Sequence, residues 1–222
     1  MELIVSLPRN EVELARAAEE GGADAIKLHL NALHHASGTR FGSFAEELPR
    51  LEAILDAVEL TVGIMPGTDR LPSPEELAEL NRMGISFLDI YYHHMPLWLM
   101  KMPNFNKIPA LDWQAGLEDI FELSRMNAEG LAEFAMVELS IVHPDDYGQP
   151  LSLADLLRYR SFIEASQLPV LIPTQKAIQP EEVEVLAELG VEAVMIGVVV
   201  TGQEAGQVEQ ATRAFRQAID RL

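Results

Sequence analysis

Short runs of β-branched and apolar residues alternate along the chain with longer stretches in which apolar residues recur every three or four positions. Runs of the first kind are typical of buried strands, and stretches of the second kind are typical of amphipathic helices. The alternation recurs about eight times, which predicts repeated strand–helix units and a parallel sheet. We expect strands at 3–7, 25–30, 60–65, 87–92, 108–111, 134–142, 169–173 and 193–199.

Helix boundaries are indicated by proline and acidic residues. Ser73-Pro74 and Gln179-Pro180 are both followed by two glutamates, and proline in the first turn with acidic neighbours favours a helix start. The segment 96–106 is less regular and predicts a short helix or a loop over one end of the sheet. We expect helices at 11–20, 44–58, 74–83, 117–127, 153–166, 180–189 and 207–222.

Glycine marks the junction between a helix and the next strand at Gly22, Gly84 and Gly190. A glycine suits the left-handed position that ends many helices. No linker or low-complexity stretch divides the chain. We therefore predict that residues 1–222 form a single domain, a (β/α)8 TIM barrel, with an open doubly wound sheet as the alternative.

Composition narrows the classes of partner. The chain has 48% hydrophobic and 23% charged residues, as ordinary globular proteins do, and its net charge of −19 disfavours nucleic acid and anionic membranes. It has no cysteine, which excludes disulfides, thiolate metal sites and a cysteine nucleophile. A basic leader and a run of about 18 apolar residues are both missing, so we expect a cytoplasmic protein. A small-molecule substrate is consistent with this composition and charge. Whether the protein forms a homo-oligomer is left undecided by the sequence.

Polar residues alternate with apolar ones on the even-numbered strands. Since alternate residues of a barrel strand face inward, one set of side chains should point into the barrel. Alternate strands contribute to shared layers. We therefore predict one layer of Lys27, Asp89 and Glu138, with His29, Tyr91 and Ser140 above it. The next inward positions along the second and fourth predicted strands are Asn31 and His93. The alternative to a functional role is that the charged residues of this layer form an ion pair that only stabilises the barrel.

All six histidines fall on or just after these strands. Active sites of such barrels lie at this rim, where imidazole can transfer protons, bind a metal or hold a substrate hydroxyl. His29, His93 and a carboxylate could hold a divalent metal, but no compact ligand motif is present. We therefore predict no cofactor and leave a metal open. The histidines are His29, His34, His35, His93, His94 and His143.

Three loops add candidate ligands for an anionic substrate. Arg40 lies in the long glycine-bearing loop 31–43 and could clamp an anion, unless this is an ordinary solvent loop. Barrels often bind phosphate through the loops after their last two strands. We predict a phosphate-binding role there, with tight packing as the alternative for the glycines. The candidates are Thr174, Lys176, Gly197, Val198 and Gly202.

The segments 169–182 and 189–197 resemble the phosphate-binding barrel enzymes, particularly the N-acetylmannosamine-6-phosphate 2-epimerase family. The resemblance implies a barrel that binds a phosphorylated sugar. In that family a lysine on the third strand and a glutamate on the seventh transfer protons. This chain has Met65 and Pro173 thereabouts, so the family's catalytic residues are not carried over.

The leading hypothesis is an epimerase or isomerase that transfers protons on a phosphorylated or polyhydroxylated carbonyl compound. Lys27, Glu138 and His93 would exchange protons, Asp89 would tune Lys27, and His29 or Tyr91 would polarise the substrate oxygen. Asn31, Arg40, Ser140 and Lys176 would help bind the substrate. The alternatives are an aldolase or lyase in which Lys27 forms a Schiff base, which Asp89 disfavours, and a non-catalytic metabolite-binding barrel.

Overall fold

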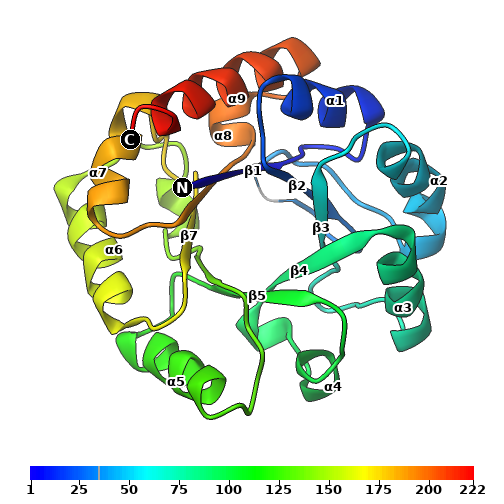
Figure 1. Ribbon diagram of the computed structural model, residues 1–222, viewed down its shortest axis with the longest axis horizontal. Helices are drawn as coiled ribbons and strands as arrows, with labels where there is room; N and C mark the ends of the chain where they lie inside the picture. Colours follow the sequence, from blue (N-terminus) through cyan, green and yellow to red (C-terminus); the bar gives the residue numbers. More distant parts are fainter. Residues whose placement is uncertain (35) are drawn as a thin grey trace.

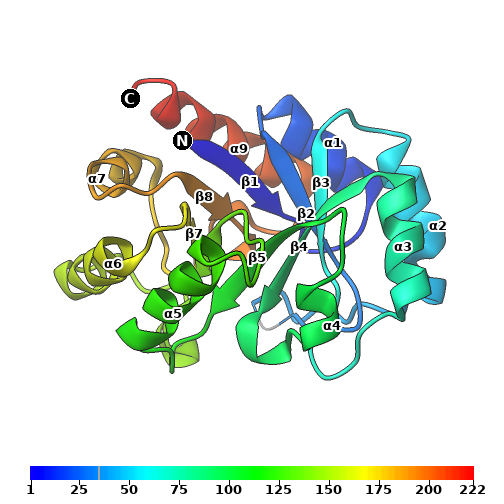
Figure 2. The same ribbon diagram turned by 60° about the horizontal axis from the view of Figure 1, so that its bottom comes forward.

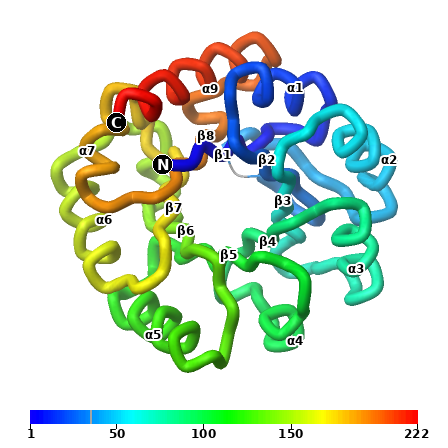
Figure 3. Tube along the Cα trace, viewed as in Figure 1, coloured from blue at the N-terminus to red at the C-terminus, as the bar shows by residue number. Residues whose placement is uncertain are grey.

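The computed structural model describes residues 1–34 and 36–222. Within this part of the chain, eight parallel strands close into a barrel in sequence order, and the helices surround it as an outer ring (Figure 1, Figure 3). The first strand pairs with the eighth, with Glu2 opposite Ala193, so the sheet has no open edge. The predicted (β/α)8 TIM barrel is confirmed.

The strands are β1 (Glu2–Ser6), β2 (Ala25–His29), β3 (Thr61–Met65), β4 (Ile85–Tyr91), β5 (Asn106–Leu111), β6 (Val137–Leu139), β7 (Val170–Pro173) and β8 (Ala193–Ile196). The helices are α1 (Val12–Glu20), α2 (Phe44–Leu55), α3 (Pro74–Met83), α4 (Leu97–Met100), α5 (Leu117–Ala128), α6 (Leu153–Ala165), α7 (Val183–Glu188), α8 (Val198–Thr201) and α9 (Ala205–Ile219). Short 3-10 turns cover Tyr92–His94, Pro144–Asp146 and Pro180–Glu182.

Two strand predictions were too long by three residues or more. The eighth expected strand, 193–199, ends at Ile196, and the three valines after Gly197 begin the short helix α8. Tertiary context overrides the β propensity of valine there. The sixth, 134–142, shrinks to β6, while Phe134 makes only an isolated bridge to Lys107. Residues beyond β6 therefore belong to loops that can carry ligand-binding groups.

Helix α3 shows why the predicted boundaries hold. The Glu76 N–H donates to the Ser73 hydroxyl at 3.2 Å, and the Ser73 N–H donates to the Glu76 carboxylate at 2.7 Å, which completes a capping box. The helix ends at Gly84 with φ of 116°, the left-handed conformation that glycine adopts without steric cost. In the described residues, no helix combines the length and the apolar character that crossing a bilayer requires.

The barrel interior is apolar at the end where the strands begin. Ile4, Phe87 and Leu171 belong to one buried cluster there. Gly63 on β3 lies against the Phe87 ring, since a Cβ at position 63 would come within 2.1 Å of that ring. Figure 2 shows both chain termini at this end and the strands running away from them. The polar side chains therefore collect at the opposite end of the barrel.

Candidate functional site

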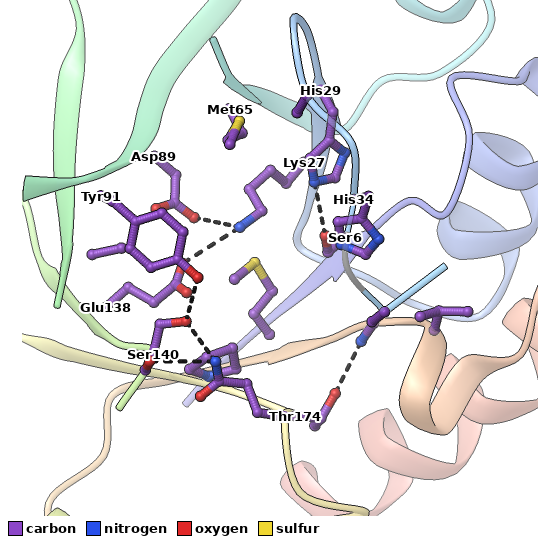
Figure 4. A pocket seen from close by; sticks show the side chains of 18 of the residues that line it. Ser6, Lys27, His29, His34, Met65, Asp89, Tyr91, Glu138, Ser140 and Thr174 are labelled. Carbon is purple, nitrogen blue, oxygen red and sulfur yellow. Dashed lines mark hydrogen bonds and ion pairs between the residues drawn. The ribbon is translucent and has the colours of Figure 1, made fainter. Parts of the chain in front are cut away.

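A cavity of about 200 Å³ opens where the strands end. Figure 4 shows charged, hydroxyl and imidazole side chains converging on it from several strands. This volume is below the roughly 300–1,000 Å³ of pockets for drug-sized ligands, so the cavity suits a small metabolite. The polar side chains that line it are Ser6, Lys27, His29, His34, Thr68, Asp89, Tyr91, Glu138, Ser140, Tyr147, Thr174 and Gln175.

Lys27 lies at the centre of a buried charged cluster. Its Nζ is 2.7 Å from Asp89 Oδ2 and 3.4 Å from Glu138 Oε2. The residues are only 7%, 2% and 4% exposed for Lys27, Asp89 and Glu138. They come from β2, β4 and β6, so the predicted layer of alternate strands is present. Charges buried this deeply are tolerated because they are paired.

Burial and the neighbouring charges shift the pKa values of Glu138 and Lys27 in this cluster. Burial, followed by the Asp89 carboxylate, raises the pKa of Glu138 well above its ordinary value, although Lys27 opposes the shift. Burial alone would lower the pKa of Lys27, but Asp89 and Glu138 outweigh it and raise that pKa. These shifts favour an ammonium at Lys27 and a protonated carboxyl group at Glu138. An acid and a base lie side by side.

His29 lies beside this cluster as a neutral imidazole. Burial, His34 and Lys27 together lower its pKa well below 6.5. Its Nε2 is 3.4 Å from the Ser6 hydroxyl, and its ring stacks on Phe41 with centroids 4.7 Å apart. Its Nδ1 is buried and has no hydrogen-bond partner among the residues that the structure describes. A neutral imidazole here can polarise a substrate oxygen without bringing a second cation.

A hydroxyl wall, defined here as Tyr91, Ser140 and Tyr147, forms the side of the cavity next to Glu138. Tyr91 Oη and Ser140 Oγ are 3.2 Å apart. The Gln175 amide donates to Ser140 Oγ at 2.7 Å and also to the Tyr147 hydroxyl. Burial, and then Glu138, raise the pKa of Tyr91, so its phenol stays protonated at neutral pH.

The predicted phosphate-binding residues divide between two places. Thr174, Gly197 and Val198 line the cavity, and the Gly197 N–H donates to Thr174 Oγ1 at 3.0 Å. Gly202 lies instead in a separate hollow between α8 and α9. Helix α8 begins at Val198, so its start lies at the cavity.

Besides Gly202, four predicted residues lie outside this cavity. His93 follows the end of β4, where a 3-10 turn breaks the strand alternation, and its Nδ1 lies 3.3 Å from Asp112 Oδ2 at the rim. Asn31, with φ of 48°, donates to the Pro66 carbonyl, and Arg40 is exposed. Lys176 is buried against α6, 3.5 Å from Asp155 Oδ2.

The remaining histidines are spread around the rim. His34 lines the cavity, and its Nδ1 is 2.8 Å from the Ser37 hydroxyl. His94 and His143 approach Asp69 and Asp145 at 3.8 and 3.6 Å. His35 lies outside the described residues. Across the residues that are described, no group of three or more His, Asp or Glu side chains is arranged to hold a metal ion.

Sequence reasoning missed the cavity roles of Ser6, Tyr147 and Gln175. Ser6 could have been found, because the alternation that faces Ile4 inward on β1 does the same for Ser6. Tyr147 and Gln175 lie in the loops after β6 and β7, and loops have no periodicity from which an orientation follows.

No protein-family model matches the chain, and no curated protein matches it either. Among solved structures, phosphoribosyl anthranilate isomerase from Thermus thermophilus superposes with a TM-score of 0.69 at 16% identity, over 100% of this chain and 99% of its own. For thiamine phosphate pyrophosphorylase from Pyrococcus furiosus the TM-score is 0.67 at 17% identity, over 99% of this chain and 96% of its own. For tryptophan synthase from Mycobacterium tuberculosis the TM-score is 0.71 at 14% identity, over 98% of this chain and 92% of its own. At these identities the likeness shows a shared fold.

Proposed function

We propose that the protein is an isomerase or epimerase of a small carbonyl compound and that it works by proton transfer. The observation that carries this proposal is the buried cluster of Lys27, Asp89 and Glu138 at the base of the cavity. Among the proteins that share the fold, one is named a phosphoribosyl anthranilate isomerase and another a thiamine phosphate pyrophosphorylase. A sugar phosphate or a related carbonyl compound therefore stands as the substrate class.

The cluster supplies the groups that such a reaction needs. A base removes the proton next to the carbonyl, and the resulting enolate accepts a proton at the neighbouring position or on the other face. In our proposal Asp89 takes up the first proton, and the neutral Glu138 returns one. The Lys27 ammonium and the His29 imidazole stabilise the negative charge on the enolate oxygen. Because Asp89 and Glu138 interact, their proton belongs to the pair.

A Schiff-base aldolase is the weaker candidate. It requires a neutral lysine amine, whereas Asp89 and Glu138 raise the pKa of Lys27 and hold it as an ammonium. A non-catalytic binding barrel would use the same residues for recognition alone. The experiments below distinguish both alternatives from isomerisation.

Solvent deuterium exchange tests the proposal. The protein is incubated in D2O with aldoses, ketoses and their phosphate esters, and proton NMR follows deuterium entering carbon. We expect exchange without carbon–carbon cleavage in the wild type and a loss of roughly 10²–10⁴-fold in Asp89→Asn. Asp56→Asn, at the exposed end of α2, is the matched control and should keep wild-type exchange.

Two further measurements separate the alternatives. Borohydride in the presence of substrate would trap an adduct on Lys27 only if a Schiff base forms, and such an adduct would contradict our mechanism. We expect exchange to survive dialysis against EDTA. Loss of exchange that a divalent ion restores would show that a metal takes part.

A further inference from the structure

The hydroxyl wall has a defined hydrogen-bond direction, and Gln175 sets it. The Val142 N–H donates to Gln175 Oε1 at 3.1 Å, which fixes which end of the amide is oxygen. The Nε2 group must then face the wall, where it donates to Ser140 and Tyr147. Gln175 is 6% exposed, so the protein holds this orientation from behind the cavity surface.

The direction of donation that Gln175 sets continues through Ser140 to Tyr91. Since Ser140 Oγ accepts a proton from Gln175, the Ser140 hydroxyl proton is left to donate, and Tyr91 Oη is 3.2 Å away. With Ser140 as the donor, Tyr91 Oη accepts one hydrogen bond from behind, and its own O–H is left for the cavity.

The surroundings of the hydroxyl wall disfavour a negatively charged ligand. Asp89 and Glu138 adjoin it and oppose ionisation of the Tyr91 phenol. The Gly197 N–H, which could face a phosphate, already donates to Thr174. The ammonium groups of Lys27 and Lys176 are both bound to carboxylates. A phosphate dianion placed here would lose its hydration, and both of these lysines are already paired with carboxylates.

We infer that this wall recognises an uncharged, hydroxyl-bearing carbonyl compound, such as a free sugar, and that Gln175 is the positioning residue that makes Tyr91 a hydrogen-bond donor to it. The inference rests on the proposed function and narrows its substrate class, a sugar phosphate or a related carbonyl compound, to the unphosphorylated members. A hydroxyl group fits because it both accepts from Tyr91 and donates to a neighbouring oxygen.

Gln175→Glu tests the role of the amide. The carboxylate can still accept from the Val142 N–H, but its second oxygen cannot donate, so Ser140 and Tyr147 must turn their protons toward it. We expect KM for free sugars to rise roughly 10-fold with kcat nearly unchanged, as the loss of one hydrogen bond predicts. Gln114→Glu, in an exposed loop, should leave both constants at their wild-type values. A Gln175→Glu protein with wild-type KM would overturn the inference.

Ser140→Ala covers the case in which Gln175→Glu does not fold, because it removes only one oxygen. It should raise KM in the same way, and an unchanged KM would count against the relay through Ser140. Circular dichroism and thermal unfolding establish that each variant is folded before its kinetics are compared.

Paired substrates test the charge preference. D-glucose, D-mannose and D-fructose are compared with their 6-phosphates by deuterium exchange. We expect the free sugars to exchange at least 10-fold more efficiently, and a preference for the phosphates would overturn the inference.

If no compound exchanges, the proposed function fails, and thermal stabilisation by the same pairs decides the inference separately. Stabilisation of the wild type by free sugars, beyond that of Gln175→Glu at equal concentration, would support it. Equal shifts in both proteins, a larger shift with the phosphates, or no shift would contradict it.

Discussion

Glu138 is a carboxyl group whose neutral form the protein stabilises. Burial and Asp89 raise its pKa well above the ordinary value, so replacing it with the neutral isostere glutamine changes its charge little at neutral pH. We expect Glu138→Gln to keep the free energy of unfolding within about 1 kcal/mol of the wild type, since the hydrogen-bonded neighbours stay paired. Deuterium exchange should fall by roughly 10²–10⁴-fold, because the amide cannot deliver a proton.

Urea unfolding and exchange kinetics measure the two effects. Glu75→Gln, at the exposed start of α3, is the control for replacing a glutamate as such. A Glu138→Gln protein that retained wild-type exchange would remove Glu138 from the mechanism.

His29 makes stability depend on pH. Its folded-state pKa lies well below the ordinary 6.5, so below pH 6.5 the unfolded chain binds a proton that the folded protein does not. The contribution of His29 to stability is therefore complete above pH 6.5 and is lost as the pH falls toward the folded-state pKa. We expect the free energy of unfolding to fall over this range, and His29→Gln should show a shallower fall. Urea unfolding at a series of pH values checks this.

The pH series has an internal control. Gln114→Asn, in an exposed loop, replaces a residue that does not titrate, and its slope should equal the wild-type value. Equal slopes for the wild type and His29→Gln would show that His29 is not held neutral by the fold.

At the level of single residues, strand alternation predicted the charged layer correctly, because the inward position of Lys27 and Glu138 depends only on local backbone geometry. His93 was placed in the same series, but β4 ends at Tyr91 and the alternation stops with it. Gln175 could not be predicted, since its orientation depends on a hydrogen bond to Val142 from another loop.

At the level of elements, the contact between β3 and β4 depends on a missing side chain. A Cβ on Gly63 would lie 2.1 Å from the Phe87 ring, so Gly63→Ala forces the ring or the strand to move. We expect a loss of about 1–3 kcal/mol in the free energy of unfolding, the usual range for overpacking. Phe87→Leu should recover part of this loss in the double variant, and a double-mutant cycle from urea unfolding measures the coupling.

The cycle contradicts our interpretation if the two changes are additive, because additivity would mean that the ring and the new methyl group do not meet. Gly206→Ala, where a Cβ would meet nothing within 4 Å, is the matched control.

The elements themselves were predictable where periodicity was strong and less so where it was short. Glycine junctions and capping residues placed α3 correctly, since their signals are local. The three valines after Gly197 were assigned to a strand by their propensity, yet they form the first turn of α8. What decides their conformation is the end of the pairing between β7 and β8, which no local pattern reveals.

The whole molecule carries a net charge of −19, while the charged cluster inside the cavity is nearly balanced. Self-repulsion among surface carboxylates destabilises the compact state, and salt screens it. We expect the midpoint of thermal unfolding to rise as NaCl increases from about 0.01 M to about 0.15 M, where the screening length falls from about 30 to 8 Å. Differential scanning calorimetry measures it, and an unchanged or falling midpoint would contradict it.

Closure of the ring between β1 and β8 has a kinetic consequence. These strands come from opposite ends of the sequence. The chain must therefore lose the entropy of bringing them together before their pairing contributes any stability. Until β8 is available, β1 keeps an unpaired edge above an unfinished apolar interior, which is a surface prone to association with other chains. The nascent protein is therefore most vulnerable to aggregation just before its last strand is synthesised.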